Sequence, residues 1–363
     1  MQRISGPLTG WFSQNRREME WRASASPYYV WVSEIMLQQT RVETVRPYFH
    51  RFVQALPDVG ALAACDEEKL LKLWEGLGYY SRVRNMQRAS RIVMEQYDGI
   101  LPADAADLKA LPGIGSYTAG AIASIAYGRP EPAVDGNVLR VLSRVYGSYA
   151  CVDDPKVKAG YEDLIRRELT SETAPDPGIF NQALMELGAL VCLPLASAMC
   201  GGCPIRSLCR AYAEHAVEDL PVRKAKQPRR VEEKTVLVVR DGERTILHKR
   251  PDTGLLAGMW ELPNLEGYLS VAQALEAARR IGIIPLKITP LPDRKHIFTH
   301  VEWHMRGYLI QSGETEALAD GYAEVDPEET KHSYSIPSAF AGYTRYLQIV
   351  QGQKRFGEEF RDP

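Results

Sequence analysis

The sequence has 363 residues, enough for two or three domains, and its 45% hydrophobic content supports packed cores and argues against a disordered chain. The net charge is −2, so a DNA-binding surface would have to concentrate positive charge locally. No signal peptide is visible and no apolar run is long enough to cross a bilayer, so we expect no membrane association.

The first informative element is a mostly buried helix expected within Val30–Thr40. Glu34 stands among core residues such as Ile35 and Leu37, where a carboxylate is costly unless it is paired or protonated. Two interpretations are open. Glu34 either pairs with an arginine at the helix surface or is an acid whose raised pKa lets it donate a proton near neutral pH.

A glycine turn, two aromatic residues and a basic helix follow within 75–91. Between Tyr79 and Arg91 there are four arginines, at 82, 84, 88 and 91, and no acidic residue. Arginines can bind phosphates and an aromatic ring can stack on bases, so this stretch is a plausible DNA surface. The alternative is an ordinary solvated basic face.

The stretch 111–120 predicts a tight turn that opens a helix. Pro112, Gly113 and Gly115 do not continue a helix, and the backbone N–H groups left free at the start of the next helix can seat a phosphate. Twenty residues after Gly115, Asp135 precedes a second helix. Taken separately, such a turn and such an aspartate are more often structural features, the latter an N-cap.

Further helices are expected at about 156–170 and 178–191, and a cysteine cluster follows them. Cys192, Cys200, Cys203 and Cys209 are separated by seven, two and five residues. Four crowded thiols favour a metal site in a reducing compartment over disulfides, either a [4Fe–4S] cluster or a structural zinc. The remaining cysteines, 65 and 151, are expected to be ordinary thiols.

From 221 to 234 the chain is basic and contains two prolines, which predicts a linker. Strands are expected at 235–240 and 246–250, and a helix at 270–281. His296, His300 and His304 invite a zinc hypothesis, but the alternation around them suggests an extended chain. There, residues four apart lie about 13 Å from one another, too far to share one ion.

The hairpin of Gly113 and Gly115 followed by Asp135 resembles the helix-hairpin-helix DNA glycosylases of the endonuclease III superfamily. This resemblance implies that the hairpin holds the DNA backbone and that Asp135 acts at the sugar of an extruded nucleotide. Strand-cutting members carry a lysine two residues after the second glycine, where this chain has Tyr117. A phenol cannot form an imine, and a tyrosine there resembles the MutY-type adenine DNA glycosylases.

The resemblance extends from about residue 20 to 345 and assigns roles residue by residue. It implies that Glu34 protonates adenine, that Tyr79 is a wedge entering the base stack, and that the cysteines hold a [4Fe–4S] cluster. The first cysteine gap has seven residues where the family usually has six. The other implied site residues are Tyr117 and Asn137 beside the carboxylates, Trp21, Arg22, Leu37 and Gln182 around the adenine, and Gln39 and Thr40 in the space left in the duplex.

The C-terminal part resembles a Nudix fold at Gly258–Asn264. A Nudix hydrolase needs an Arg-Glu-x-x-Glu-Glu helix to hold magnesium, and the helix expected at 270–281 contains only Glu276 as an acid. The fold is therefore expected to serve as a reader. Phe298, Thr299 and His300 resemble the family's Phe-Ser-His loop, which senses 8-oxoguanine, with threonine replacing serine.

The sequence thus predicts a multidomain protein. It has an all-α helix-hairpin-helix glycosylase domain at 1–220, with an iron–sulfur loop at 192–209, a basic linker at 221–234 and an α+β Nudix-like domain at 235–363. The expected activity is monofunctional excision of adenine opposite 8-oxoguanine or guanine in double-stranded DNA, by a monomer in the bacterial cytoplasm at the nucleoid. The alternatives are a bifunctional enzyme acting on oxidised pyrimidines, a non-catalytic DNA-binding protein and, more remotely, a Nudix hydrolase.

Overall fold

The computed structural model describes residues 2–24, 26–225, 227–313 and 317–349, so the end of the predicted C-terminal domain, 350–363, lies outside the described residues. The chain forms two compact units. Unit 1 contains residues 1–64 and 84–226, and unit 2 contains residues 65–83 and 227–363. Within the described ranges, no helix is long and apolar enough to cross a membrane.

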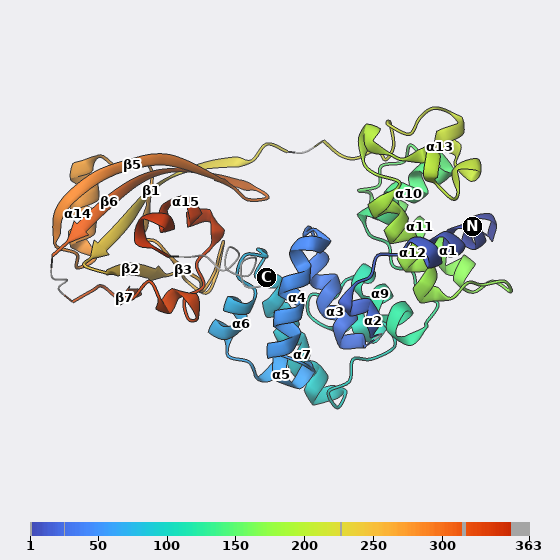
Figure 1. The fold of residues 1–363 in the computed structure, drawn as a ribbon, viewed down its shortest axis with the longest axis horizontal. Helices are drawn as coiled ribbons and strands as arrows, with labels where there is room; N and C mark the ends of the chain where they lie inside the picture. Colours follow the sequence, from blue (N-terminus) through green and yellow to red (C-terminus); the bar gives the residue numbers. More distant parts are fainter. Residues whose placement is uncertain (1, 25, 226, 314–316, 350–363) are drawn as a thin grey trace, which may run out of the picture. The chain divides into compact units, whose positions relative to one another are not determined.

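Unit 1 is helical throughout (Figure 1). Its α-helices are α1 (Gln2–Asn15), α2 (Glu20–Ala23), α3 (Pro27–Leu37), α4 (Val42–Ala55), α5 (Val59–Ala64), α7 (Ser81–Gln96, which begins in unit 2), α8 (Ala105–Ala110), α9 (Ser116–Tyr127), α10 (Gly136–Tyr146), α11 (Pro155–Leu169), α12 (Pro177–Leu190) and α13 (Arg210–Ala213). Short 3-10 turns at Leu195–Ser197, Cys200–Gly202 and Arg206–Leu208 shape the cysteine loop.

One apolar core joins the N-terminal helix to the second half of unit 1. The predicted apolar face of α10, including Val138 and Leu142, is buried there with residues of α11 and α12. Helix α1 adds Leu8 and Phe12, which are four residues apart and therefore lie on one helical face. Helices α10, α11 and α12 were predicted from the sequence, whereas α1 was not.

The predicted turn and helix at 111–120 are confirmed. Gly113 has φ +79°, a left-handed conformation that favours glycine, and Gly115 is the N-cap of α9. A Cβ at Gly113 would also lie 2.6 Å from the Cβ of Asn85. Both backbone conformation and close packing therefore require glycine at the bend of this hairpin.

In the part of unit 2 that the structure describes, a seven-stranded mixed sheet has the order β3-β2-β1-β6-β5, to which β4 adds beside β1 and β7 beside β2. Strands β1 and β6 are parallel and the other pairs are antiparallel. The elements are α6 (Glu67–Leu73), β1 (Arg230–Asp241), β2 (Arg244–Lys249), β3 (Trp260–Glu261), β4 (Asn264–Glu266), α14 (Val271–Arg280), β5 (Pro285–Ile297), β6 (Val301–Ser312), β7 (Tyr322–Val325), α15 (Ala341–Thr344) and the 3-10 turns Glu329–Lys331, Ser338–Phe340 and Arg345–Leu347.

Apolar clusters cover both faces of this sheet, as alternation along β1 requires. Leu237 and Val239 face α14, whereas Val236 and Val238 face the C-terminal turns around Phe340. Figure 1 shows α14 and α15 beside the strands of this unit.

Two sequence expectations need correction in unit 2. Strand β1 begins at Arg230, so the last five residues of the predicted linker, 230–234, pair with β6. The segment 296–304 is not one extended chain but a hairpin, because β5 ends at Ile297 and β6 begins at Val301. The backbone N–H of Phe298 donates to the carbonyl of Val301 over 2.8 Å and closes the turn.

Candidate active site and cofactor loop

A pocket of about 930 Å³ in unit 1 gathers ten of the residues that the sequence singled out. They come from the segments around α2, α3, α9, α10 and α12, which are far apart in the chain. The ten are Trp21, Arg22, Glu34, Leu37, Gln39, Thr40, Tyr117, Asp135, Asn137 and Gln182. The two acidic side chains, Glu34 and Asp135, therefore face the same space.

Glu34 lies in α3 and is only 8% exposed, which excludes the surface interpretation. The hydroxyl of Tyr117, in the first turn of α9, donates a hydrogen bond to its carboxylate. Burial raises the pKa of Glu34 to about 7 and the neighbouring Asp135 adds to the rise, while the Tyr117 hydrogen bond and Arg22 oppose it. A carboxyl with this pKa can hold and release a proton near neutral pH.

Asp135 is the N-cap of α10 and also lines the pocket. The sequence left an N-cap and a site residue open as alternatives, and the position of Asp135 fits both. Its carboxylate accepts a backbone hydrogen bond from Val138 and a side-chain bond from Asn137, each 2.8 Å long. Burial raises the pKa of Asp135, but these bonds and the positive charge of Arg140 favour its anion. Burial thus raises the pKa of both carboxyls, and the hydrogen bonds from Val138 and Asn137 with the charge of Arg140 limit the rise for Asp135.

A chain of contacts fixes Asn137, the partner of Asp135. Arg140 donates to the amide oxygen of Asn137 over 2.8 Å and to the carbonyls of Gly188 and Cys192 over 2.7 Å. A Cβ at Gly188 would lie 2.6 Å from that of Asn137, so the glycine lets α12 approach α10. The aspartate is therefore held by two tightly packed helices.

A buried ion-pair cluster that the sequence analysis did not assign lines the same pocket. Glu186 is 1% exposed and accepts from Arg17 at 2.9 Å and from Arg22 at 3.0 Å. These two arginines hold the pKa of Glu186 at about 2, against the opposing effect of burial. Arg22 is thereby fixed at the pocket wall. The sequence contained an indication of this buried ion-pair cluster, because Glu186, like Glu34, interrupts an apolar helix.

The four clustered cysteines line one cavity with apolar residues of α10 and α12, including Val141 and Leu187. Burial, with the other three cysteines adding to the effect, raises the pKa of Cys203 to about 11, so a cationic centre is needed if all four are to be thiolates. In the part of the chain that the structure describes, no three His, Cys, Asp or Glu side chains are placed to hold one metal ion. The gap between Cys192 and Cys200 contains the exposed turn Leu195–Ser197, in which Leu195 is 74% exposed.

In unit 2, the predicted wedge and reader residues meet. The hydroxyls of Tyr79 and Thr299 lie 2.6 Å apart, and the Tyr79 side chain is 46% exposed. Thr299 and His300 are exposed at the turn between β5 and β6, whereas Phe298 packs its ring against His296 and Trp303. Phe298 therefore supports the turn, and the two exposed residues present polar groups to solvent.

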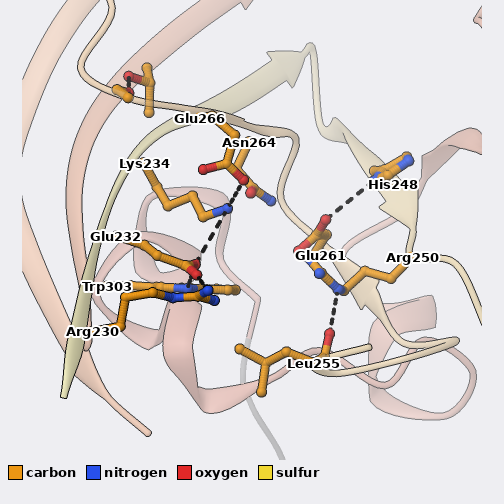
Figure 2. A network of polar contacts seen from close by, with 12 residues as sticks. Arg230, Glu232, Lys234, His248, Arg250, Leu255, Glu261, Asn264, Glu266 and Trp303 are labelled. Carbon is orange, nitrogen blue, oxygen red and sulfur yellow. Dashed lines mark hydrogen bonds and ion pairs between the residues drawn. The ribbon is translucent and has the colours of Figure 1, made fainter. Parts of the chain in front are cut away.

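Unit 2 also contains a network of polar contacts around Trp303 and Glu261 (Figure 2). The Trp303 indole donates to Glu232 over 2.8 Å. Glu261, at the Nudix-like motif, is 3% exposed and lies between Arg250 at 2.6 Å and His248 at 3.2 Å. Both of its carboxylate oxygens are thus engaged by protein groups, and the only acid in α14, Glu276, pairs with Arg280. Both carboxylates therefore have partners within the protein.

Comparisons with known proteins agree with this architecture. The family model described as "HhH-GPD superfamily base excision DNA repair protein" matches residues 32–167, and a NUDIX domain model matches residues 235–345. A solved structure of a thermostable thymine-DNA glycosylase has a TM-score of 0.52 and 23% identity, covering 59% of this chain and 96% of that one. At this identity the likeness concerns the fold alone.

Curated relatives extend over most of the chain. The adenine DNA glycosylases of Mus musculus and Homo sapiens are 36% and 34% identical to it, over 84% and 96% of this chain and 69% and 74% of theirs. The adenine DNA glycosylase of Buchnera aphidicola subsp. Schizaphis graminum is 32% identical, over 84% of this chain and 86% of its own length. With a helical unit in which Glu34 and Asp135 line one pocket, and a Nudix-like domain that follows later in the sequence, the chain belongs to the adenine DNA glycosylase family.

Proposed function

We propose that this enzyme hydrolyses the N-glycosidic bond of adenine mispaired with 8-oxoguanine or guanine in double-stranded DNA, and leaves an abasic site. The observation that carries the proposal is that Glu34, with a pKa raised by burial to about 7, and Asp135, whose carboxylate accepts two hydrogen bonds, line one pocket. The adenine nucleotide would leave the stack at a cost of about a few kcal/mol, repaid by contacts in the pocket.

The proposed chemistry divides between the two acids. Glu34 gives its proton to the purine ring, so that neutral adenine departs with the electrons of the N-glycosidic bond. The Asp135 carboxylate stabilises the cationic sugar, or attacks it as in retaining glycosidases, and water completes the hydrolysis. General acid catalysis typically contributes about 10²- to 10⁴-fold, so the charge of Asp135 must supply a large further share.

The pocket walls supply the groups that an adenine needs. Trp21 and Leu37 offer apolar surface, and Gln182 offers an amide to the edge of the base. Arg22, held by Glu186, would fix the shape of that wall. Tyr117 and Asn137 would orient the two carboxylates through the hydrogen bonds already described.

We propose a monofunctional reaction because the group at the lyase position is a phenol. No lysine is among the described residues that line the pocket, so no amine is available to trap the sugar as an imine. The deciding experiment is a single-turnover assay on an 8-oxoguanine:adenine duplex beside a thymine-glycol duplex. Adenine release without strand cleavage or borohydride trapping is expected. Trapping, or cleavage at thymine glycol, would refute the proposal in favour of a bifunctional enzyme.

Recognition of the opposite base is proposed for unit 2. The hydroxyl of Thr299 and the exposed His300 would contact 8-oxoguanine, with Phe298 holding their turn in place. Thr299→Val keeps the shape and removes the hydroxyl. It should reduce the preference for 8-oxoguanine over guanine opposite adenine, and an unchanged preference would remove Thr299 from the reader.

In unit 1, we propose DNA contacts at the hairpin bend before α9 and at the turn after α3. The bend at Gly113 and Gly115 would hold the DNA backbone at the start of α9. Gln39 and Thr40, in the turn after α3, would occupy the space that the adenine leaves. We expect one chain to suffice, because its own residues complete the pocket, and we expect it to act on chromosomal DNA in a bacterial cytoplasm.

The cofactor proposed for the cavity of Cys192, Cys200, Cys203 and Cys209 is a [4Fe–4S] cluster. The cysteines fit it better than zinc, since each thiolate of such a cluster binds a different iron and no three need to surround one ion. The cluster would stabilise the loop after α12. Purified protein should contain iron and acid-labile sulfide in about equal amounts, about four of each per chain, and stoichiometric zinc instead would overturn the assignment.

A further inference from the structure

The loop before α7 holds an aromatic side chain in an unusual backbone conformation. Gly76 and Gly78 have φ +99° and +69°, and Tyr79 follows with φ +47°. A residue with a Cβ is uncommon in this left-handed region and stays there only where its surroundings hold it. The ring of Tyr79 nevertheless remains 46% exposed.

Arg82, in the first turn of α7, makes the contacts that hold this loop. Its guanidinium donates to the carbonyl of Leu77 over 3.0 Å and to that of Gly78 over 3.2 Å. Its backbone N–H donates to the carbonyl of Tyr79 over 2.9 Å. The indole N–H of Trp74 also donates to the Gly78 carbonyl, over 3.1 Å. The carbonyls of three successive residues before α7, Leu77, Gly78 and Tyr79, thus accept hydrogen bonds from Arg82 or Trp74.

The same guanidinium lies between two aromatic rings. Its carbon is 5.3 Å from the centroid of the Trp74 ring and 5.5 Å from that of Tyr79. Trp74 is fully buried, so it forms a fixed wall, and Arg82 connects the exposed ring of Tyr79 to that wall. Burial lowers the pKa of Arg82 to about 10, which leaves it charged at neutral pH.

We propose that Arg82 is a positioning residue that holds Tyr79 ready to enter the DNA base stack. This inference rests on the proposed function, in which Tyr79 is the wedge beside the lesion pair. Arginine suits this position, because one guanidinium nitrogen donates to two carbonyls while the planar group lies over the rings of Trp74 and Tyr79. Lysine keeps the charge but lacks the planar group that covers these rings.

Arg82 is expected to affect DNA binding and not the bond-breaking step. Arg82 does not line the pocket of Glu34 and Asp135, so its loss should leave the bond-breaking step intact once DNA is bound. Without Arg82 only a fraction of molecules would hold Tyr79 in the binding-competent orientation, and the dissociation constant would rise by the inverse of that fraction. We expect about a tenfold loss of affinity, as for removal of hydrogen bonds from a charged group.

The test is a double-mutant cycle in the full-length protein. Arg82→Lys and Arg82→Gln are made in the wild-type and Tyr79→Leu backgrounds, and Arg167→Lys, at an exposed arginine of α11 outside the stretch 75–91, serves as a control. Affinity is measured for a duplex with 8-oxoguanine opposite a 2′-fluorinated adenosine that resists cleavage. The single-turnover excision rate at saturating enzyme is measured on the ordinary adenine duplex.

Both Arg82 variants should bind about tenfold more weakly, excise at the wild-type rate when saturated, and cause no further loss in the Tyr79→Leu background. An equal further loss in that background, a slower saturated rate, or failure of both variants to fold would show a general structural role and overturn the inference. Wild-type affinity in Tyr79→Leu would refute the wedge itself. Weak binding by Tyr79→Leu with normal binding by the Arg82 variants would refute the role of Arg82 alone.

Discussion

Replacing Glu34 with glutamine should make the protein more stable at alkaline pH than the wild type. The pKa of Glu34 rises from 4.5 to about 7 on folding, so the folded state holds this proton more tightly than the unfolded state. The resulting stability is complete below pH 4.5 and is lost as the pH rises through 7. Glutamine has no proton to lose and can still accept the Tyr117 hydrogen bond.

The magnitude follows from the size of the pKa change. A rise from 4.5 to about 7 corresponds to about 3 kcal/mol at high pH, of which about 2–3 kcal/mol develops between pH 5 and pH 8. Because Glu34 is only 8% exposed, solvent screens little of this effect. The difference in free energy of unfolding between Glu34→Gln and the wild type should therefore grow by that amount over this range.

Thermal unfolding of the helices, followed by circular dichroism from pH 5 to pH 8, measures this difference. A helical unit of this size shifts its midpoint by about 2–4 °C per kcal/mol, so the advantage of Glu34→Gln should grow by about 5–10 °C. Glu172→Gln, at an exposed carboxyl before α12, is the control and should show no such trend. A constant difference between Glu34→Gln and the wild type across the pH range would refute the burial of a protonated acid.

The remaining predictions concern the same pocket. Single-turnover excision should decline as the pH rises above about 7, because Glu34 then loses its proton. Tyr117→Phe removes a hydrogen bond that lowers the pKa of Glu34, so it should move the decline to higher pH. A pH-independent excision rate would contradict proton donation by Glu34. Asp135→Asn should bind lesion DNA normally and lose at least about 10²-fold in excision rate, measured under saturation. Glu186→Gln should cost about 3 kcal/mol at neutral pH in urea unfolding, and the gap should close as the pH falls from 4.5 towards 2, because the wild-type carboxylate then takes up its proton.

The sequence was informative where the signal is local. Glu34 within an apolar helix, the turn at Gly113 and the N-cap at Asp135 were all recognised from neighbouring residues. The structure has a helix or turn at each place, although α3 begins at Pro27 and ends at Leu37, before the predicted end at Thr40. The cysteine spacing likewise indicated four sulfurs around one cavity. Local patterns succeed here because capping, helical periodicity and glycine conformations depend on a few adjacent residues.

What the sequence did not reveal depends on long-range packing. Arg17 and Arg22 lie 169 and 164 residues before Glu186, so nothing near either arginine indicates the pairing. Helix α1 contains Pro7 and two glycines, which weaken its helical signal, and only burial against α12 explains its formation. The grouping of residues 65–83 with the C-terminal sheet was also unforeseen, because it depends on contacts such as that between Tyr79 and Thr299.

The residue at position 117 affects both the protonation of adenine by Glu34 and the capture of the sugar by an amine. The Tyr117 hydroxyl stabilises the Glu34 anion only as a neutral donor, and burial still keeps the pKa of Glu34 near 7. A lysine ammonium in the same position would add a full positive charge within contact distance and would lower that pKa strongly. Glu34 would then lose its proton at neutral pH. A lysine at position 117 that could trap the sugar would therefore deprive Glu34 of the proton that adenine needs. Tyr117 leaves that proton on Glu34.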